Sequence, residues 1–168
     1  MKPKYEVYYG GLGSGKSKYA LDQLPPERVF KLGAGNKFLD WIYLRPGAVK
    51  KHELDNIRRG IEFKGTTPDQ IVADIEEIKK PILAIDDWTT FYKYSTLWSP
   101  ERISQKCREV FDSINNNKNL EMVVFVVWDA QTWLPFGLYK KRAVWNKELF
   151  KVADEITKIE YGIPLRIK

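Results

Sequence analysis

Residues 10 to 17 read GGLGSGKS, and this stretch decides the class of fold that the sequence predicts. It satisfies the pattern G-x-x-x-x-G-K-[ST], whose fixed positions are occupied here by Gly10, Gly15, Lys16 and Ser17. A strand pattern precedes the stretch and a helix pattern follows it, which is the context in which such a loop binds nucleotide phosphates. The stretch therefore predicts a phosphate-binding loop.

Each residue type in this loop has a physical role. Glycines let backbone N–H groups wrap closely around phosphate oxygens, in conformations that a Cβ would obstruct. We expect Lys16 to reach the β- and γ-phosphates, Ser17 to ligate Mg²⁺, and the start of the following helix to add partial positive charge. The predicted ligand is ATP or GTP with Mg²⁺. The predicted nucleotide-binding residues are Gly10, Gly11, Leu12, Gly13, Ser14, Gly15, Lys16, Ser17 and Lys18.

An acidic pair follows an apolar strand pattern later in the chain. Pro81 opens the run ILAI, and Asp86 and Asp87 follow it directly. A carboxylate at the end of a buried strand can hold the magnesium shell of a nucleotide. We therefore expect Asp86 to join Ser17 at the metal and Asp87 to orient water or an acceptor hydroxyl. The alternative for both aspartates is a turn or a helix cap.

Three further candidates could sense the γ-phosphate or a bound substrate. Met122 to Trp128 predicts a second buried strand, and Asp129 and Gln131 follow its end. A simple strand-to-loop transition is the alternative for these two. In the basic run from Lys140 to Arg142, Arg142 could contact a phosphate or act as a finger toward a neighbouring subunit's nucleotide. A plain solvated surface is the alternative for that run.

Strand and helix patterns alternate along the chain. A helix capped by Thr67, with Pro68 at its first position and Gln70 completing a capping box, is among the clearest. This alternation predicts a mostly parallel sheet covered on both faces, a three-layer α/β/α domain that binds its ligand at the carboxyl ends of the strands. Strands are expected at Lys4 to Tyr9, Arg28 to Leu32, Trp41 to Leu44, Ile82 to Ile85, Met122 to Trp128, Glu155 to Tyr161 and Leu165 to Lys168. Of Arg28 to Leu32 and Trp41 to Leu44, at least one is expected to be a true strand. The other expected helices are Lys16 to Leu24, Val49 to Arg59, one beginning at Ser99 and Pro100, and Ala143 to Ala153.

Composition sets further bounds. The 168 residues fit one domain, and 43% hydrophobic content can bury a core. Neither a membrane-spanning run nor a signal peptide is present, so we expect a cytoplasmic protein.

Cys107, the single cysteine, follows a helical apolar spacing and is expected in the core. The aromatic residues from Trp88 to Trp98 could stack on a base or fill a lid or core. The net charge of +6 suits a nucleotide, a phosphorylated metabolite or nucleic acid.

The sequence resembles the adenosylcobinamide kinase and adenosylcobinamide-phosphate guanylyltransferase family of cobalamin biosynthesis. GGLGSGKSKYA (10–20) is similar to that family's first motif, and VADEITKIEYGIPLRIK (152–168) is similar to its last segment. ILAIDDWTTF (82–91) is similar to the family's strand, aspartate and threonine, and Asn146 stands where a family asparagine precedes the last helix. The resemblance implies a RecA-like P-loop sheet and phosphotransfer from ATP or GTP to a corrinoid hydroxyl.

The chain also departs from that family. The guanylyltransferase step of the family uses a histidine, and Ile61 stands at the corresponding position. His52, the only histidine, lies nearby and could be the nucleophile in a shifted register, or it could be structural. WDAQ replaces the family's NEVG, and Gly13 replaces an arginine in the loop.

The sequence supports three functions. The leading hypothesis is a small-molecule kinase of the cobinamide kinase type, acting on a corrinoid or another small acceptor. The second is a RecA-like ATPase linked to nucleic acid, of a viral or plasmid motor type that assembles into rings. The third is a nucleotide binder that regulates a partner. We expect a homo-oligomer that does not associate with a membrane.

Overall fold

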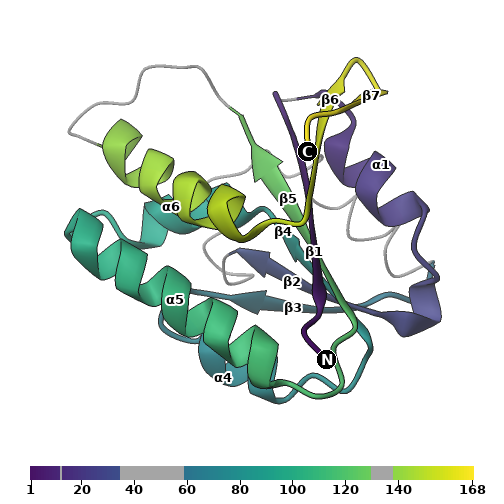
Figure 1. Cartoon of the computed structure of the whole chain (residues 1–168), viewed down its shortest axis with the longest axis horizontal. Helices are drawn as coiled ribbons and strands as arrows, with labels where there is room; N and C mark the ends of the chain where they lie inside the picture. Colours follow the sequence, from purple (N-terminus) through teal and green to yellow (C-terminus); the bar gives the residue numbers. More distant parts are fainter. Residues whose placement is uncertain (12, 35–58, 130–137) are drawn as a thin grey trace.

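The computed structural model describes residues 1–11, 13–34, 59–129 and 138–168, and these residues build a seven-stranded sheet (Figure 1). The strand order is β3-β2-β4-β5-β1-β6-β7. Neighbouring strands run parallel, except that β7 is antiparallel to β6. The strands are β1 (Lys4–Gly10), β2 (Val29–Ala34), β3 (Glu62–Thr66), β4 (Ile82–Asp86), β5 (Met122–Trp128), β6 (Glu155–Glu160) and β7 (Ile163–Arg166).

Alternate residues of the central strands fill the two faces of the sheet. In β5, Val123, Phe125 and Val127 join the larger hydrophobic cluster, and Val124 and Val126 join the smaller one. Successive side chains of a strand point to opposite faces, so a strand that is apolar at every position is buried on both sides. The apolar runs in β4 and β5 were predicted as buried strands for this reason, and the structure confirms both.

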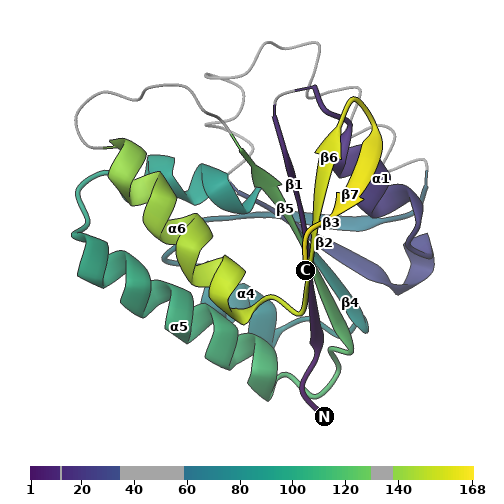
Figure 2. The same ribbon diagram turned by 45° about the horizontal axis from the view of Figure 1, so that its top comes forward.

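Helices cover both faces of the sheet (Figures 1 and 2). One face is covered by α1 (Lys16–Asp22), and the other by α4 (Ile71–Glu76), α5 (Pro100–Asn116) and α6 (Leu138–Val152). Ser99 caps α5 as predicted, because its side chain accepts the Arg102 N–H at 3.2 Å. Cys107 is fully buried on the inner side of α5, and burial raises the pKa of its thiol. The predicted α/β fold with a mostly parallel sheet is confirmed.

The aromatic stretch after β4 packs into the core through Trp88, Phe91, Tyr92 and Trp98, and burial excludes these four as an open stacking surface. It forms the short 3₁₀ helix η2 (Trp88–Tyr94), in which Trp88 and Phe91 are fully buried. The Trp88 ring lies against Phe91, Phe111, Phe125 and Trp145, with centroid distances between 5.2 and 5.8 Å. Its Nε1–H donates to the Trp145 carbonyl at 2.9 Å. The prediction that these aromatic residues fill the core is confirmed, and the alternative prediction that they stack on a base is wrong.

Several predicted boundaries are wrong. The capping box is absent: α4 begins at Ile71, and the Thr67 carbonyl accepts the backbone N–H groups of Gln70 and Ile71 in a preceding turn. The last helix begins at Leu138, five residues before Ala143. β3 was not predicted, because its sequence EFKGT has polar side chains and a glycine, as is common in an edge strand.

Some predicted elements lie outside the described residues. These are the strand at Trp41 to Leu44 and nearly all of the helix expected from Val49 to Arg59; Arg59 itself lies in a turn. In the parts of the chain that the structure describes, no helix has the length and apolar character needed to cross a membrane.

Replacing Trp88 tests how far the fold depends on the aromatic cluster. We expect Trp88→Ala to lower the free energy of unfolding by about 3–5 kcal/mol, because it leaves a cavity beneath η2 and α6. Urea denaturation monitored by circular dichroism measures this change. Leu97→Ala is the control, because Leu97 is 97% exposed and its truncation leaves no cavity. Equal stability of the two variants would contradict the central position of Trp88.

Candidate functional site

The parallel strands bring the predicted site residues to one edge of the sheet. Gly10 at the end of β1 pairs with Trp128 at the end of β5, and Asp86 at the end of β4 pairs with Val126. The ends of parallel strands meet at the same edge, where ligands bind in open α/β sheets. β5 lies between β1 and β4, so the 10–17 loop and the acidic pair are one strand apart.

The backbone of the predicted phosphate loop requires glycine at several positions. Gly13 and Gly15 have φ of 72° and 81°, in the left-handed region that glycine adopts without steric cost. A Cβ on Gly10 would lie 2.4 Å from the Ile159 carbonyl oxygen and 2.6 Å from the Ser14 hydroxyl oxygen. The loop is therefore tightly wound against β6 before α1 begins.

Lys16 and Ser17 open α1 beside the acidic pair. The Lys16 ammonium donates to the Gly11 carbonyl at 3.4 Å, so its side chain lies over the loop. The Ser17 hydroxyl donates to Asp86 Oδ1 at 3.3 Å. The two residues expected at the metal are thus neighbours in space, although 69 positions separate them in sequence. Lys18 is exposed, and Leu12 lies outside the described residues.

A buried lysine completes this arrangement, and sequence reasoning missed it. Lys31 lies on β2 with 4% of its surface exposed, and its Nζ is 3.2 Å from Asp86 Oδ2. The two oxygens of Asp86 therefore have different partners, Ser17 on one and Lys31 on the other. The available signal was a charged residue inside the strand sequence VFKLGA, since lysine is almost never fully buried unless it is paired.

Asp87 is held by backbone hydrogen bonds and has a raised pKa. Its Oδ1 accepts the backbone N–H of Thr89 at 2.8 Å and that of Trp128 at 3.3 Å, so it caps η2. Burial raises the pKa of its carboxyl to about 7, and the charge of Asp86 adds to the rise. The Lys16 charge and the Thr89 hydrogen bonds oppose it. Asp87 therefore caps a helix, as the alternative prediction had it, and its carboxyl can also exchange protons near neutral pH.

Thr89 connects the acidic pair to α6. Its Oγ1 accepts the Trp128 backbone N–H at 2.9 Å and lies 3.2 Å from Asn146 Oδ1. Asn146 lies inside α6, which agrees with the helix predicted from Ala143 to Ala153 and differs from the family pattern, in which the asparagine precedes the last helix. Residues from η2, β5 and α6 thus meet next to Asp87.

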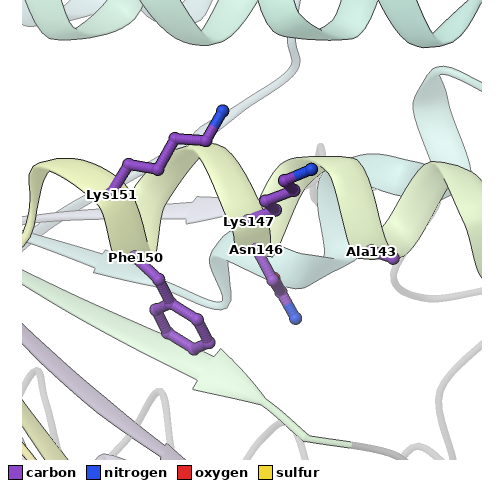
Figure 3. A pocket seen from close by; sticks show the side chains of 5 residues that line it. All are labelled: Ala143, Asn146, Lys147, Phe150 and Lys151. Atoms are coloured by element: carbon purple, nitrogen blue, oxygen red, sulfur yellow. The ribbon is translucent and has the colours of Figure 1, made fainter.

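A hollow of about 530 Å³ lies along α6 beside this contact (Figure 3). Asn146 and Phe150 point to the same side of the helix, and Lys147 and Lys151 point away from them. The Phe150 ring is 5.6 Å from that of Tyr9, next to Gly10 in β1. One end of the hollow therefore lies close to the start of the predicted phosphate loop.

Of the other predicted site residues, the structure describes Asp129 and Arg142. The Asp129 backbone N–H donates to the Gly10 carbonyl at 2.9 Å, which places Asp129 next to the loop. Arg142 is only 4% exposed, with its guanidinium 5.7 Å from the centre of the Trp128 ring. A finger toward a neighbouring subunit needs an exposed guanidinium, so the finger role expected for Arg142 does not fit this position. Gln131 and His52 lie outside the described residues.

The Ser17 hydroxyl and the Asp86 carboxylate fit a magnesium ion that is bound together with phosphate. Mg²⁺ is usually held by one or two carboxylates together with substrate phosphates and water. The Ser17 hydroxyl and Asp86 Oδ1 supply two hard oxygen atoms 3.3 Å apart, beside the loop. Within the described ranges, no group of three or more His, Cys, Asp or Glu residues forms a separate metal site.

Comparison with known proteins supports the fold. No family model matches the sequence, and no curated protein matches it. Among solved structures, the chain is similar to an ATPase from the type III secretion system of pathogenic bacteria, with a TM-score of 0.57 and 9% identity. The match covers 98% of this chain and 57% of that one. The fold is similar to that of an ATPase. The resemblance to the adenosylcobinamide kinase family rests on the sequence motifs alone.

Removing Lys31 tests the buried ion pair. We expect Lys31→Met to lower the free energy of unfolding by about 3–5 kcal/mol, because Asp86 would keep a buried charge without its cation. Urea denaturation at neutral pH measures the loss. Lys93→Met is the control, since Lys93 is an exposed lysine of η2. If adding Asp86→Asn to Lys31→Met restores no stability, the explanation by uncompensated charge is wrong.

The raised pKa of Asp87 predicts a pH dependence of stability in the nucleotide-free protein. The pKa of Asp87 is about 7 in the folded state, and its ordinary value is 3.8, so between these pH values the folded protein binds more protons than the unfolded protein does. The contribution of Asp87 to the free energy of unfolding is therefore fully present below about pH 4. It falls as the pH rises toward 7, by at most about 1.4 kcal/mol per pH unit. We expect Asp87→Asn to flatten the thermal-melting profile between pH 4.5 and about 7. Asp69→Asn at an exposed position should leave the slope unchanged, and an unchanged slope in Asp87→Asn would contradict the assignment.

Proposed function

We propose that this protein is a magnesium-dependent nucleoside triphosphatase that binds ATP or GTP on the Gly10–Ser17 loop. The observation that carries the proposal is the proximity of the Ser17 hydroxyl and Asp86 at 3.3 Å, beside a glycine loop at the carboxyl ends of parallel strands. The similarity in fold to an ATPase supports it. We infer the RecA-like form of the P-loop fold, acting in the cytoplasm.

The residues of the site have distinct roles in this proposal. Backbone N–H groups of the loop and the Lys16 ammonium bind the phosphate oxygens and stabilise the charge that develops during transfer. Ser17 and Asp86 would hold Mg²⁺, which supplies positive charge to the phosphate oxygens when bound. Lys31 fixes the orientation of Asp86 through the buried ion pair between its Nζ and Asp86 Oδ2.

Asp87 is the candidate general base. A general base works best when its pKa is near the working pH, and burial brings the pKa of Asp87 to about 7. Its Oδ1 is fixed by the backbone N–H groups of Thr89 and Trp128. The carboxyl can therefore orient an attacking water and accept its proton.

The hollow along α6 favours a second candidate, a kinase that transfers the phosphoryl group to a small acceptor. Asn146 lines the hollow and also contacts Thr89, next to Asp87. An acceptor bound in the hollow would lie near Thr89, whose backbone N–H donates to Asp87, so its hydroxyl could replace the attacking water. A corrinoid is the acceptor that the sequence resemblance favours.

Replacement of Lys16 tests the proposed function. We expect Lys16→Ala to lower the rate of phosphate release from Mg·ATP or Mg·GTP at least about 100-fold, because the lysine charge stabilises the transferred group. Malachite-green detection of phosphate measures the rate. Thermal melting without nucleotide should be nearly unchanged, because Lys16 is half-buried at the loop and its ammonium donates a long hydrogen bond of 3.4 Å to the carbonyl of the exposed Gly11. Full turnover in the variant would contradict the proposal.

The same assay separates the candidate classes. Hydrolysis without any added acceptor favours the triphosphatase. Phosphorylation of adenosylcobinamide, detected by mass spectrometry and lost in Asn146→Ala, favours the kinase. A many-fold stimulation by single-stranded DNA, together with ring assembly in analytical ultracentrifugation, favours a homo-oligomeric motor linked to nucleic acid.

A further inference from the structure

The turn of the β6–β7 hairpin is held directly against the loop. Tyr161 and Gly162 connect the paired residues Glu160 and Ile163, with φ of 51° and 76°, which describes a two-residue turn with positive φ at both positions. The Gly162 N–H donates to the Ser14 carbonyl at 2.9 Å. A Cβ on Gly15 would lie 3.7 Å from the Gly162 Cα. The turn therefore forms one wall of the loop.

Neither packing nor turn geometry explains a tyrosine at position 161. Its side chain is 96% exposed. Turns of this kind favour Asn, Asp or Gly at their first central position, because positive φ is costly for a bulky side chain. Unfavourable backbone geometry that persists next to a ligand site is a reason to look for a function.

The strand order determines where the base of a bound nucleotide would lie. Under the proposed function, on which this inference rests, the γ-phosphate faces Asp86 and Asp87 at the end of β4. β4 lies on one side of β1, and β6 and β7 lie on the other. A triphosphate laid along the loop from that γ-position projects its ribose and base toward the hairpin. Figures 1 and 2 show the hairpin turn beside the end of β1 and the start of α1.

We propose that Tyr161 is the stacking surface for the base of the bound nucleoside triphosphate. After β4, Trp88, Phe91, Tyr92 and Trp98 are buried in the core and cannot serve this purpose. Within the described residues, Tyr161 is the one aromatic among the strongly exposed large apolar side chains. An aromatic ring at this place can contact any base, since every base has a π-face. Its stacking would make the β6–β7 hairpin part of the nucleotide site.

Isothermal titration calorimetry with two ligands tests the proposal. Mg·ATP carries a base, and magnesium tripolyphosphate carries the phosphates alone. Tyr161→Asn removes the ring but creates Asn-Gly, the sequence that best fits this turn, so the hairpin geometry is preserved. We expect Tyr161→Asn to weaken Mg·ATP binding about 5- to 100-fold and to leave tripolyphosphate binding unchanged. Tyr161→Phe, the matched control, should bind both ligands as the wild type does.

Two results would overturn the proposal. Unchanged Mg·ATP affinity in Tyr161→Asn would show that the base does not stack there, and equal weakening of both ligands would show that the hairpin only supports the loop. Lys16→Ala separates these results from a failure of the proposed function, because it should weaken both ligands. If the wild type binds tripolyphosphate and Mg·ATP with a Lys16-dependent affinity, the proposed site is sound and the Tyr161 variants decide the inference alone.

Discussion

The parallel pairing of β5 with both β1 and β4 is the constraint on which the rest of the structure depends. It makes both faces of the central sheet hydrophobic, which requires helices on each side. It also brings the ends of the three strands to one edge, so that Gly10, Asp86 and Trp128 become neighbours. The site is thus a consequence of how the core is buried.

The site combines buried charges that would be costly if isolated. Lys31 and Asp86 are both almost fully buried, and their ion pair at 3.2 Å offsets the loss of water around each. Asp87 lies beside them and accepts hydrogen bonds from two backbone N–H groups, those of Thr89 and Trp128. Burial raises the pKa of its carboxyl to about 7. Two adjacent aspartates therefore have different environments, one ion-paired and one able to exchange protons, which is a common arrangement at catalytic sites.

The aromatic residues have two different roles, packing in the core and exposure beside the loop. Trp88, Phe91 and Trp145 fill the space between η2, α5 and α6, and the Trp88 and Trp145 indole N–H groups both find acceptors there. Tyr161 is the opposite case, exposed at the tip of a hairpin whose backbone contacts the loop. The same residue class is therefore structural on one side of β1 and a candidate for ligand contact on the other.

The sequence by itself determined the features that local chemistry controls. The glycine loop, the two continuous apolar strands and the Ser99 cap are set by steric freedom, burial on both faces and a nearby N–H, so they were predictable. Only the tertiary structure decided the pairing of Lys31 with Asp86, the contact of Asn146 with Thr89, the edge strand β3 and the contact of Gly162 with Ser14. These features join residues far apart in the chain, and no local pattern encodes them because their energy comes from packing and charge between separate elements.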